Sequence, residues 1–234
     1  MARFALQDDR GYNQVFGPIG STTLRAERRY AWFAAQAAGA ARVLELGCGL
    51  GDAAAYVATH SSAEVVAVDL SEPFLEEARA RHVHPNLRFQ QCDLFQEGWQ
   101  RLGDFDLVFG NGILHHLVPR LAEVLARLRA MAPRGRLAFI EPNLLNPACA
   151  FMFGTRLGRR LAKLEPQEMA FTPQGLRRAL AGAGWQDIRV EMRDFLLPGL
   201  NTALVRPSLA VEPLLEATAL TRWLAQSHFV TARA

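Results

Sequence analysis

The sequence contains little lysine and no concentrated positive charge. Lys163 is the only lysine, so 25 of the 26 basic residues are arginine, and the net charge is only +3. The arginines are scattered and form no stripe interleaved with aromatic residues. Because affinity for nucleic acid depends on neutralising many phosphates, we expect no nucleic-acid partner.

Cysteine and long apolar runs are also scarce. Cys48, Cys92 and Cys149 are an odd number at spacings that match neither a disulfide framework nor a zinc site. We therefore expect a reducing, cytoplasmic location and no metal site. With no run of eighteen apolar residues and no apolar leader, we expect neither a membrane span nor a signal peptide. Association with a membrane surface stays open, and no oligomeric state is predicted.

What the chain does contain is an alternation of strand and helix patterns. Its 234 residues, half of them hydrophobic, suffice for one sizeable core. Apolar runs predict strands at 42–47, 64–70, 87–94, 105–111 and 135–142, and helices are predicted at 71–81 and 119–133. This alternation is typical of an α/β fold with a parallel, doubly wound sheet covered on both faces.

The remaining segments divide the chain into a cover and a main domain. Residues 1–41 read as an N-terminal helical cover with a helix at 21–40, and residues 42–234 as the main domain. The main domain carries insertions at 143–170 and 198–226. A helix at 172–184 and strands at 185–197 and 227–234 complete it.

A strand-to-helix turn carries three glycines in the stretch "ELGCGLGD", residues 45–52. Glycine lets the backbone approach a ligand closely. Dinucleotide sites space their glycines as G-x-G-x-x-G, but the third position holds Asp52, which disfavours an NAD-dependent oxidoreductase. Glu45 suits an ammonium group, and Asp69, 22 residues after Gly47, suits a ribose diol. These residues predict a nucleoside that carries an amino acid instead of a phosphate.

Four stretches in order, "VLELGCGLG", "VVAVDLSE", "FQQCDLF" and "FDLVFGNGILHHL", resemble the motifs of class I S-adenosylmethionine-dependent methyltransferases. The resemblance implies a Rossmann-like seven-stranded sheet in the order 3-2-1-4-5-7-6 with the last strand antiparallel. It also implies S-adenosylmethionine as the cofactor. The implied contacts are Glu45, Gly47, Cys48, Gly49 and Gly51 with the methionine part, Asp69 and Leu70 with ribose and adenine, Asp93 and Leu94 with the adenine amino edge, and Asn111 and Gly112 beside the sulfonium.

Methyl transfer needs an aligned acceptor and, where the acceptor carries a proton, a base. The candidates are His115 and His116 after the fourth predicted strand and Glu141 at the end of the fifth, because ligands of open α/β sheets bind at that edge. Histidine titrates near neutral pH. Neighbouring side chains on a helical turn point about 100° apart. At most one of the two histidines is therefore expected to face the acceptor, and the other packs or caps.

The segment after the fifth predicted strand supplies candidates for acceptor binding. Asn143 and Asn146 suit either a polar acceptor or the cap of the following helix, and both interpretations stay open. Residues 143–170, which include Phe151, mix apolar and cationic side chains. A lid over an apolar acceptor pocket is favoured over a membrane-surface helix. Tyr12 and Phe16 are expected to form a second cover.

Taken together, these features predict a cytoplasmic methyltransferase that acts at oxygen or nitrogen of a small, partly apolar molecule in specialised (natural product) metabolism. A lipid-type or quinone-type acceptor is the alternative within this class. A non-catalytic scaffold that binds S-adenosylmethionine is the alternative from another class. The complete set of cofactor motifs favours the enzyme.

Overall fold

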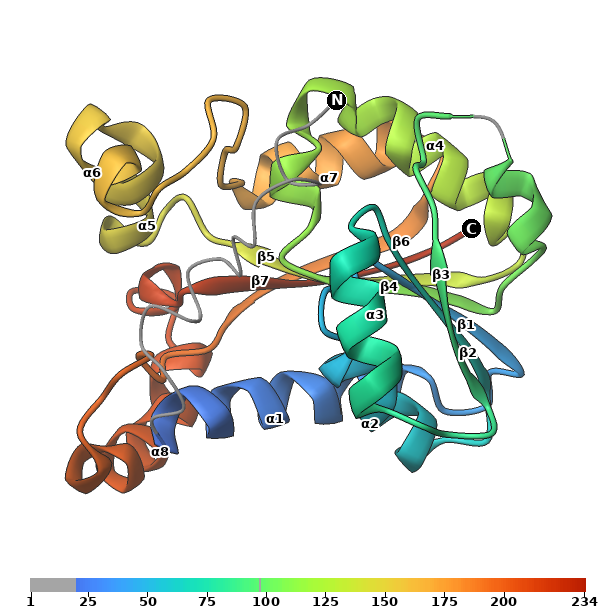
Figure 1. Ribbon diagram of the computed structural model, residues 1–234. Helices are drawn as coiled ribbons and strands as arrows, with labels where there is room; N and C mark the ends of the chain where they lie inside the picture. Colours follow the sequence, from blue (N-terminus) through green and yellow to red (C-terminus); the bar gives the residue numbers. More distant parts are fainter. Residues whose placement is uncertain (1–19, 97) are drawn as a thin grey trace.

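The strands form one seven-stranded sheet in the order β3-β2-β1-β4-β5-β7-β6 (Figure 1). The computed structural model describes residues 20–96 and 98–234. The strands are β1 (Arg42–Leu46), β2 (Glu64–Asp69), β3 (Leu87–Gln91), β4 (Leu107–Asn111), β5 (Arg136–Pro142), β6 (Gln186–Arg193) and β7 (Ser227–Arg233). β1 to β5 pair in parallel, and β7 runs antiparallel to both β5 and β6. The predicted Rossmann-like order with an antiparallel last strand is confirmed.

Helices cover both faces of this sheet. The α-helices of the described residues are α1 (Gly20–Gln36), α2 (Asp52–His60), α3 (Glu72–Arg81), α4 (Leu121–Met131), α5 (Pro147–Gly154), α6 (Arg156–Leu161), α7 (Pro173–Gly182) and α8 (Thr202–Ala217). The 3₁₀ helices are η3 (Trp99–Leu102), η4 (Leu114–His116), η5 (Val118–Arg120) and η6 (Arg222–Leu224). Buried side chains of α1, α2 and α3 form the core on one face. Figure 1 shows α4 and α7 on the other face, and their buried side chains belong to the core there.

The alternation of side chains along β1 explains where Glu45 lies. Leu44 and Leu46 belong to the core under α4 and α7, whereas Val43 belongs to the core under α1 and α2. Successive side chains of a strand point to opposite faces. Glu45 is therefore on the face covered by α1 and α2, close to the carboxyl end of its strand.

The predicted elements are present, and their ends differ for local reasons. Ser71 caps α3 as expected, because its hydroxyl accepts the backbone N–H of Phe74. The strand predicted over 185–197 is too long: β6 ends at Arg193, since Asp194 has a φ of 78°, a left-handed conformation that interrupts a strand. Within the described part of the chain, no helix is both long and apolar enough to cross a membrane.

The carboxyl ends of β1, β2, β4 and β5 meet at one edge of the sheet, because these strands are parallel. The chain leaves β5 at this edge to form α5 and α6, and it leaves β6 at the same edge to form α8 and η6. Residues 143–170 and 198–226 therefore both begin where an open α/β sheet binds ligands.

Candidate active site

The turn between β1 and α2 holds three glycines with positive φ: Gly47 (67°), Gly49 (51°) and Gly51 (79°). A Cβ on Gly47 would lie 2.6 Å from the Ile113 side chain, and one on Gly51 would lie 2.5 Å from the Phe89 ring. Packing and backbone conformation together require these two glycines. Gly49 has no atom within 4 Å of its would-be Cβ. Its bare backbone therefore faces open space at the sheet edge.

Glu45 is a buried acid with an oxygen that has no hydrogen-bond partner. Its side chain is 2% exposed, and Oε2 is unpaired. Burial, the largest cause, raises the pKa of this carboxyl well above its usual range; a backbone hydrogen bond from Ala54 opposes the shift, and the charge of Asp69 adds to it. An unpaired buried carboxylate is costly. The ammonium group of S-adenosylmethionine would supply the missing partner, so these residues fit the cofactor.

Asp69, at the end of β2, joins the glycine turn to the next helix. Its Oδ2 accepts the backbone N–H of Gly49 at 2.8 Å, and its Oδ1 accepts that of Ser71 at 2.9 Å. A carboxylate has about four acceptor positions, so both oxygens keep the capacity to accept ribose hydroxyls. This geometry pre-positions the carboxylate next to the open space at Gly49.

The other predicted cofactor residues lie along the same edge. Cys48 is buried in the turn, and burial raises the pKa of its thiol. Asp93 orders the loop after β3 by accepting the backbone N–H of Phe95 at 2.8 Å. Leu94 is 5% exposed, and Leu70 is half-buried after β2. The roles of these residues towards the cofactor stay predictions.

Glu141 organises the loop after β4. Its Oε1 accepts the backbone N–H groups of Ile113 at 3.0 Å and Leu114 at 2.7 Å, and its Oε2 lies 3.0 Å from His115 Nδ1. Glu141 is 1% exposed, and both of its carboxylate oxygens are engaged with residues 113–115. Because Nδ1 donates to the carboxylate, His115 Nε2 is left as the basic nitrogen.

His115 lies beside the predicted methyl-transfer position. A Cβ on Gly112 would lie 3.5 Å from His115 Cε1, and Gly112 follows Asn111 at the end of β4. The edge of the imidazole meets the Phe153 ring of α5, with ring centroids 5.9 Å apart. The backbone N–H of Met169 donates to the His115 carbonyl at 3.2 Å. Residues 143–170 thus contact His115 both through α5 and through the segment that returns from α6.

His116 pairs with a different acid. Its Nδ1 lies 3.2 Å from Glu168 Oε1, and Glu168 is 4% exposed. Although burial opposes ionisation, the hydrogen bond and positive charge of His116 give the Glu168 carboxyl a net lowered pKa. His115, His116 and Glu168 each offer one ligand atom, and these atoms lie within 4.8 Å of one another. Among the described residues, this is the group that could hold a metal ion.

Asn143 and Asn146 are engaged with the backbone. Asn143 is fully buried, and its Nδ2 donates to the carbonyls of Trp223 at 3.0 Å and Ala225 at 2.8 Å. Asn146 caps α5 by accepting the N–H groups of Ala148 and Cys149. The contacts of Asn146 match the capping interpretation, whereas those of Asn143 join the end of β5 to the segment before β7. Phe151 is 44% exposed on α5, and the predicted contacts of Tyr12 and Phe16 lie outside the described residues.

Two arginines of α1 lie near this edge of the sheet and were not predicted from the sequence as site residues. Arg25 and Arg29 are 8% and 9% exposed, and Arg29 Nη1 donates to Asn111 Oδ1 at 3.2 Å. A signal was present in the sequence: Ser21, Arg25, Arg29 and Phe33 recur every four residues and share the buried face of the helix.

A separate cavity of about 630 Å³ lies between α1 and α2, lined in part by Tyr30 and Asp52. It includes none of the three turn glycines.

The sequence matches a family model and several curated proteins. Residues 43–135 match a model described as a methyltransferase domain. The chain is 34% identical over 172 residues to the trans-aconitate 2-methyltransferase of Deinococcus radiodurans, covering 68% of this chain and 64% of that protein. It is 32% identical to the enzyme of the same name from Variovorax paradoxus, over 79% of this chain and 67% of that protein. The match to the Deinococcus protein thus spans less than two thirds of its length.

The fold is shared with solved structures. An S-adenosylmethionine-dependent methyltransferase from Mesorhizobium loti superposes with a TM-score of 0.65, over 92% of this chain and all of that chain, at 21% identity. At this identity the likeness establishes the fold alone. The glycine turn and Asp69 lie in the part of the chain that the family model matches, whereas Glu141 and Arg29 lie outside it.

Proposed function

Because this chain belongs to the class I S-adenosylmethionine-dependent methyltransferases, we propose that it methylates an oxygen or nitrogen of a small molecule with His115 as the base. The observation that carries this proposal is the 3.0 Å contact between His115 Nδ1 and the buried Glu141 carboxylate. The bound cofactor supplies an electrophilic methyl group on its sulfonium.

The residues of the turn and of β2 hold the cofactor in this proposal. Glu45 binds its ammonium group, which gives the unpaired Oε2 a partner, and the open backbone at Gly49 admits its methionine part. Asp69 accepts the ribose hydroxyls with the lone pairs that Gly49 and Ser71 leave free. Leu70, Asp93 and Leu94 are proposed to surround the adenine.

His115 and Glu141 act as a pair. The imidazole takes the acceptor proton at Nε2, and the Glu141 carboxylate fixes the tautomer and stabilises the imidazolium that forms. Glu141 is therefore a positioning residue and does not touch the acceptor. His115 is 13% exposed and lies against Phe153. This cover keeps water from the proton-transfer position.

The acceptor is proposed from the surroundings of His115. Residues 143–170 form a lid whose Phe153 and Phe151 suit a partly apolar molecule, in keeping with a role in specialised metabolism or, alternatively, a lipid-type or quinone-type acceptor. Two relatives are named for trans-aconitate, which adds small organic acids to the acceptors to be assayed. A cytoplasmic location is part of the proposal.

Release of S-adenosylhomocysteine from S-adenosylmethionine across an acceptor panel tests the enzyme against the non-catalytic scaffold. With an active acceptor in hand, His115→Ala should lower kcat about 100-fold, the usual contribution of a positioned base. The Kd of S-adenosylhomocysteine, measured by calorimetry, should stay within about twofold, because His115 does not form the turn. Glu141→Gln should lower kcat through the same base, so the double variant should lose little more than His115→Ala alone.

His116→Ala is the matched control. It removes the neighbouring imidazole of η4, which pairs with Glu168 and not with Glu141. A loss of kcat equal to that of His115→Ala would contradict the assignment of His115 as the base. Full additivity of His115→Ala and Glu141→Gln would contradict the paired action.

A further inference from the structure

The face of α1 that packs against the sheet carries positive charge where a hydrophobic stripe is the usual choice. Ser21, Arg25, Arg29 and Phe33 are its buried residues. α1 precedes β1, so its first turns lie towards the carboxyl edge of the sheet. Arg29 Nη1 donates to Asn111 Oδ1 at 3.2 Å, and this hydrogen bond joins α1 to the end of β4. The Arg29 guanidinium is thus held next to the proposed methyl-transfer position, and Arg25 lies one turn earlier on the same face of α1.

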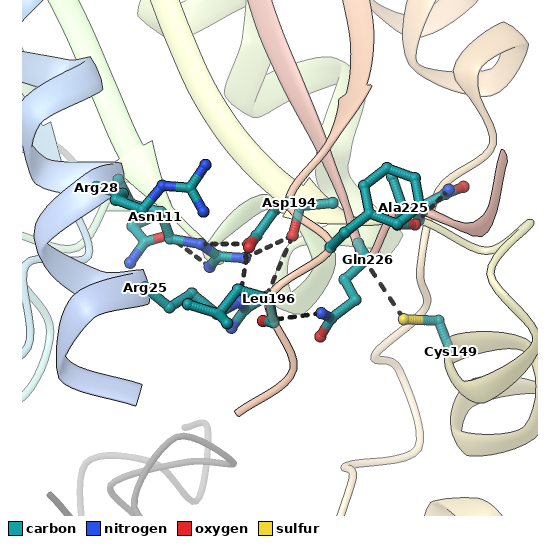
Figure 2. A network of polar contacts seen from close by, with 12 residues as sticks. Arg25, Arg28, Asn111, Cys149, Asp194, Leu196, Ala225 and Gln226 are labelled. Atoms are coloured by element: carbon teal, nitrogen blue, oxygen red, sulfur yellow. Dashed lines mark hydrogen bonds and ion pairs between the residues drawn. The ribbon is translucent and has the colours of Figure 1, made fainter. Parts of the chain in front are cut away.

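One carboxylate serves both arginines. Asp194 Oδ2 lies 2.6 Å from Arg29 Nη2 and 2.8 Å from Arg25 Nε. Arg29 also donates to the Ser227 hydroxyl and to Asn111, so most of its N–H groups are occupied. Figure 2 shows Asp194 between the α1 side chains and the ends of β6 and β7.

The guanidinium group of Arg25 makes fewer hydrogen bonds than that of Arg29. Its Nε forms an ion pair with the Asp194 carboxylate at 2.8 Å, but the N–H does not point along the line to that oxygen as a well-directed hydrogen bond would. Its Nη2 reaches Ser227 Oγ only at 3.5 Å. Burial and repulsion by Arg29 outweigh Asp194 and lower the pKa of Arg25 to about 10. The contacts described here therefore leave this guanidinium short of negative charge.

Nearby acids have other partners. Glu212 is paired with Arg28, which lies further out on α1. Glu216 accepts the backbone N–H of Asp194 and lies 3.6 Å from Arg193. Among the described contacts of Arg25 and Arg29, two cations thus share a single anion, and a buried excess charge is unfavourable unless an anion joins it.

We propose that Arg25 and Arg29 bind a carboxylate group of the acceptor, so that the substrates of this enzyme are small organic acids. The inference rests on the proposed function, since it assigns the substrate class of the same site. A carboxylate matches the planar guanidinium fork. It would sit between α1, the end of β4 and α5, whose Cys149 thiol donates to the Gln226 carbonyl beside this cluster (Figure 2). The alternative is that the arginines only fasten α1 to β6 and β7.

Calorimetric titration of the protein saturated with S-adenosylhomocysteine tests the proposal. The titrants are a library of aliphatic and aromatic mono-, di- and tricarboxylic acids, each with its neutral primary amide. The best acids should bind at least about 10-fold more tightly than their amides, as expected for charge-assisted hydrogen bonds. In Arg25→Gln the preference should fall to about twofold or less. In Asp194→Asn, which removes the competing anion, it should persist or increase.

Arg28→Gln is the matched control, because it removes a charge from the same helix but outside the cluster, and its preference for acids should equal that of the wild type. Equal binding of acids and amides by the wild type, or no binding of any acid, would overturn the carboxylate site. A lower melting temperature of Arg25→Gln with an unchanged acid-to-amide ratio would show a purely structural clamp, and so would loss of the preference in Asp194→Asn. Failure of S-adenosylhomocysteine to bind would count against the proposed function instead.

Discussion

Two regions of the molecule use buried polar side chains in opposite ways. In the cofactor half, residues 42–112, Glu45 keeps an oxygen without a partner and Gly49 faces open space. In the acceptor half, residues 113–234, Asn143 and Glu141 are buried with hydrogen bonds to backbone groups. A buried polar group without a hydrogen-bond partner destabilises the folded protein, and a ligand that supplies the partner removes this cost. Glu45 is therefore expected to gain a partner when the ligand binds, whereas Asn143 and Glu141 already use their polar groups to hold the backbone.

The two halves also differ in how far apart in the sequence their contacting residues lie. The turn glycines and Asp69 come from one strand–helix–strand unit of the chain. In contrast, Arg29 meets Asp194 across 165 residues of sequence. The cofactor half is thus specified locally, whereas the proposed acceptor contacts exist only after α1, β4 and β6 have packed together.

Asp69→Ala removes a side chain that is proposed to bind the cofactor. Loss of hydrogen bonds to a charged group costs about 1.5–3 kcal/mol, so the Kd of S-adenosylhomocysteine should rise about 10- to 100-fold in calorimetric titration. Asn143→Ala is the matched change in the other half. It should lower the free energy of unfolding, because two buried carbonyls lose a donor, and leave the Kd within about twofold. Equal Kd values for the two variants would contradict a cofactor role confined to the first half.

His228 predicts an acid limit to stability that comes from the acceptor half. This residue is fully buried, and burial lowers its pKa to about 4, although a hydrogen bond with the Phe171 carbonyl opposes the shift. Since the unfolded chain takes up the proton near pH 6.5, the stability that His228 contributes is complete above pH 6.5 and is lost as the pH falls towards 4. Urea unfolding across this range should show the loss, and His228→Gln should reduce it. An unchanged slope in the variant would remove His228 as the cause.

Glu45 predicts a smaller effect in the opposite direction, from the cofactor half. Its folded-state pKa is raised, so the stability it contributes is complete below its ordinary pKa of about 4.5. That stability is lost as the pH rises through the folded-state value. Glu45→Gln should therefore raise the melting temperature of the ligand-free protein at pH 8, yet gain less from S-adenosylhomocysteine than the wild type. A variant that is less stable without ligand would contradict an unpaired carboxylate at this position.

Much of the fold followed from the sequence because its signals are short in range. The apolar runs gave the strands, and Ser71 capped its helix as its pattern predicts. The glycine spacing identified a turn that the structure shows to be constrained by Ile113 and Phe89. The order of the strands came from the motif resemblance, since periodicity does not specify which strands are neighbours.

The acceptor side was harder to predict because the relevant contacts are tertiary. The sequence placed Glu141 at the correct edge, but only the structure shows that its carboxylate faces the loop of η4. Asn146 suited an acceptor or a cap, and its contacts with α5 match the cap. Arg25 and Arg29 share their helix face with Phe33, but the burial of two cations depends on Asp194, which is distant in sequence.

The position of β7 also affects how the chain folds during synthesis. This strand is the last of the seven along the chain, yet it pairs with both β5 and β6. Until β7 has emerged from the ribosome, β6 has no neighbour in the sheet and Ser227 cannot meet the arginines of α1. The first five strands emerge earlier, so the cofactor half is expected to form before the acceptor half. Messages truncated before β7 would yield a sheet with an open edge at β5, which is prone to aggregation.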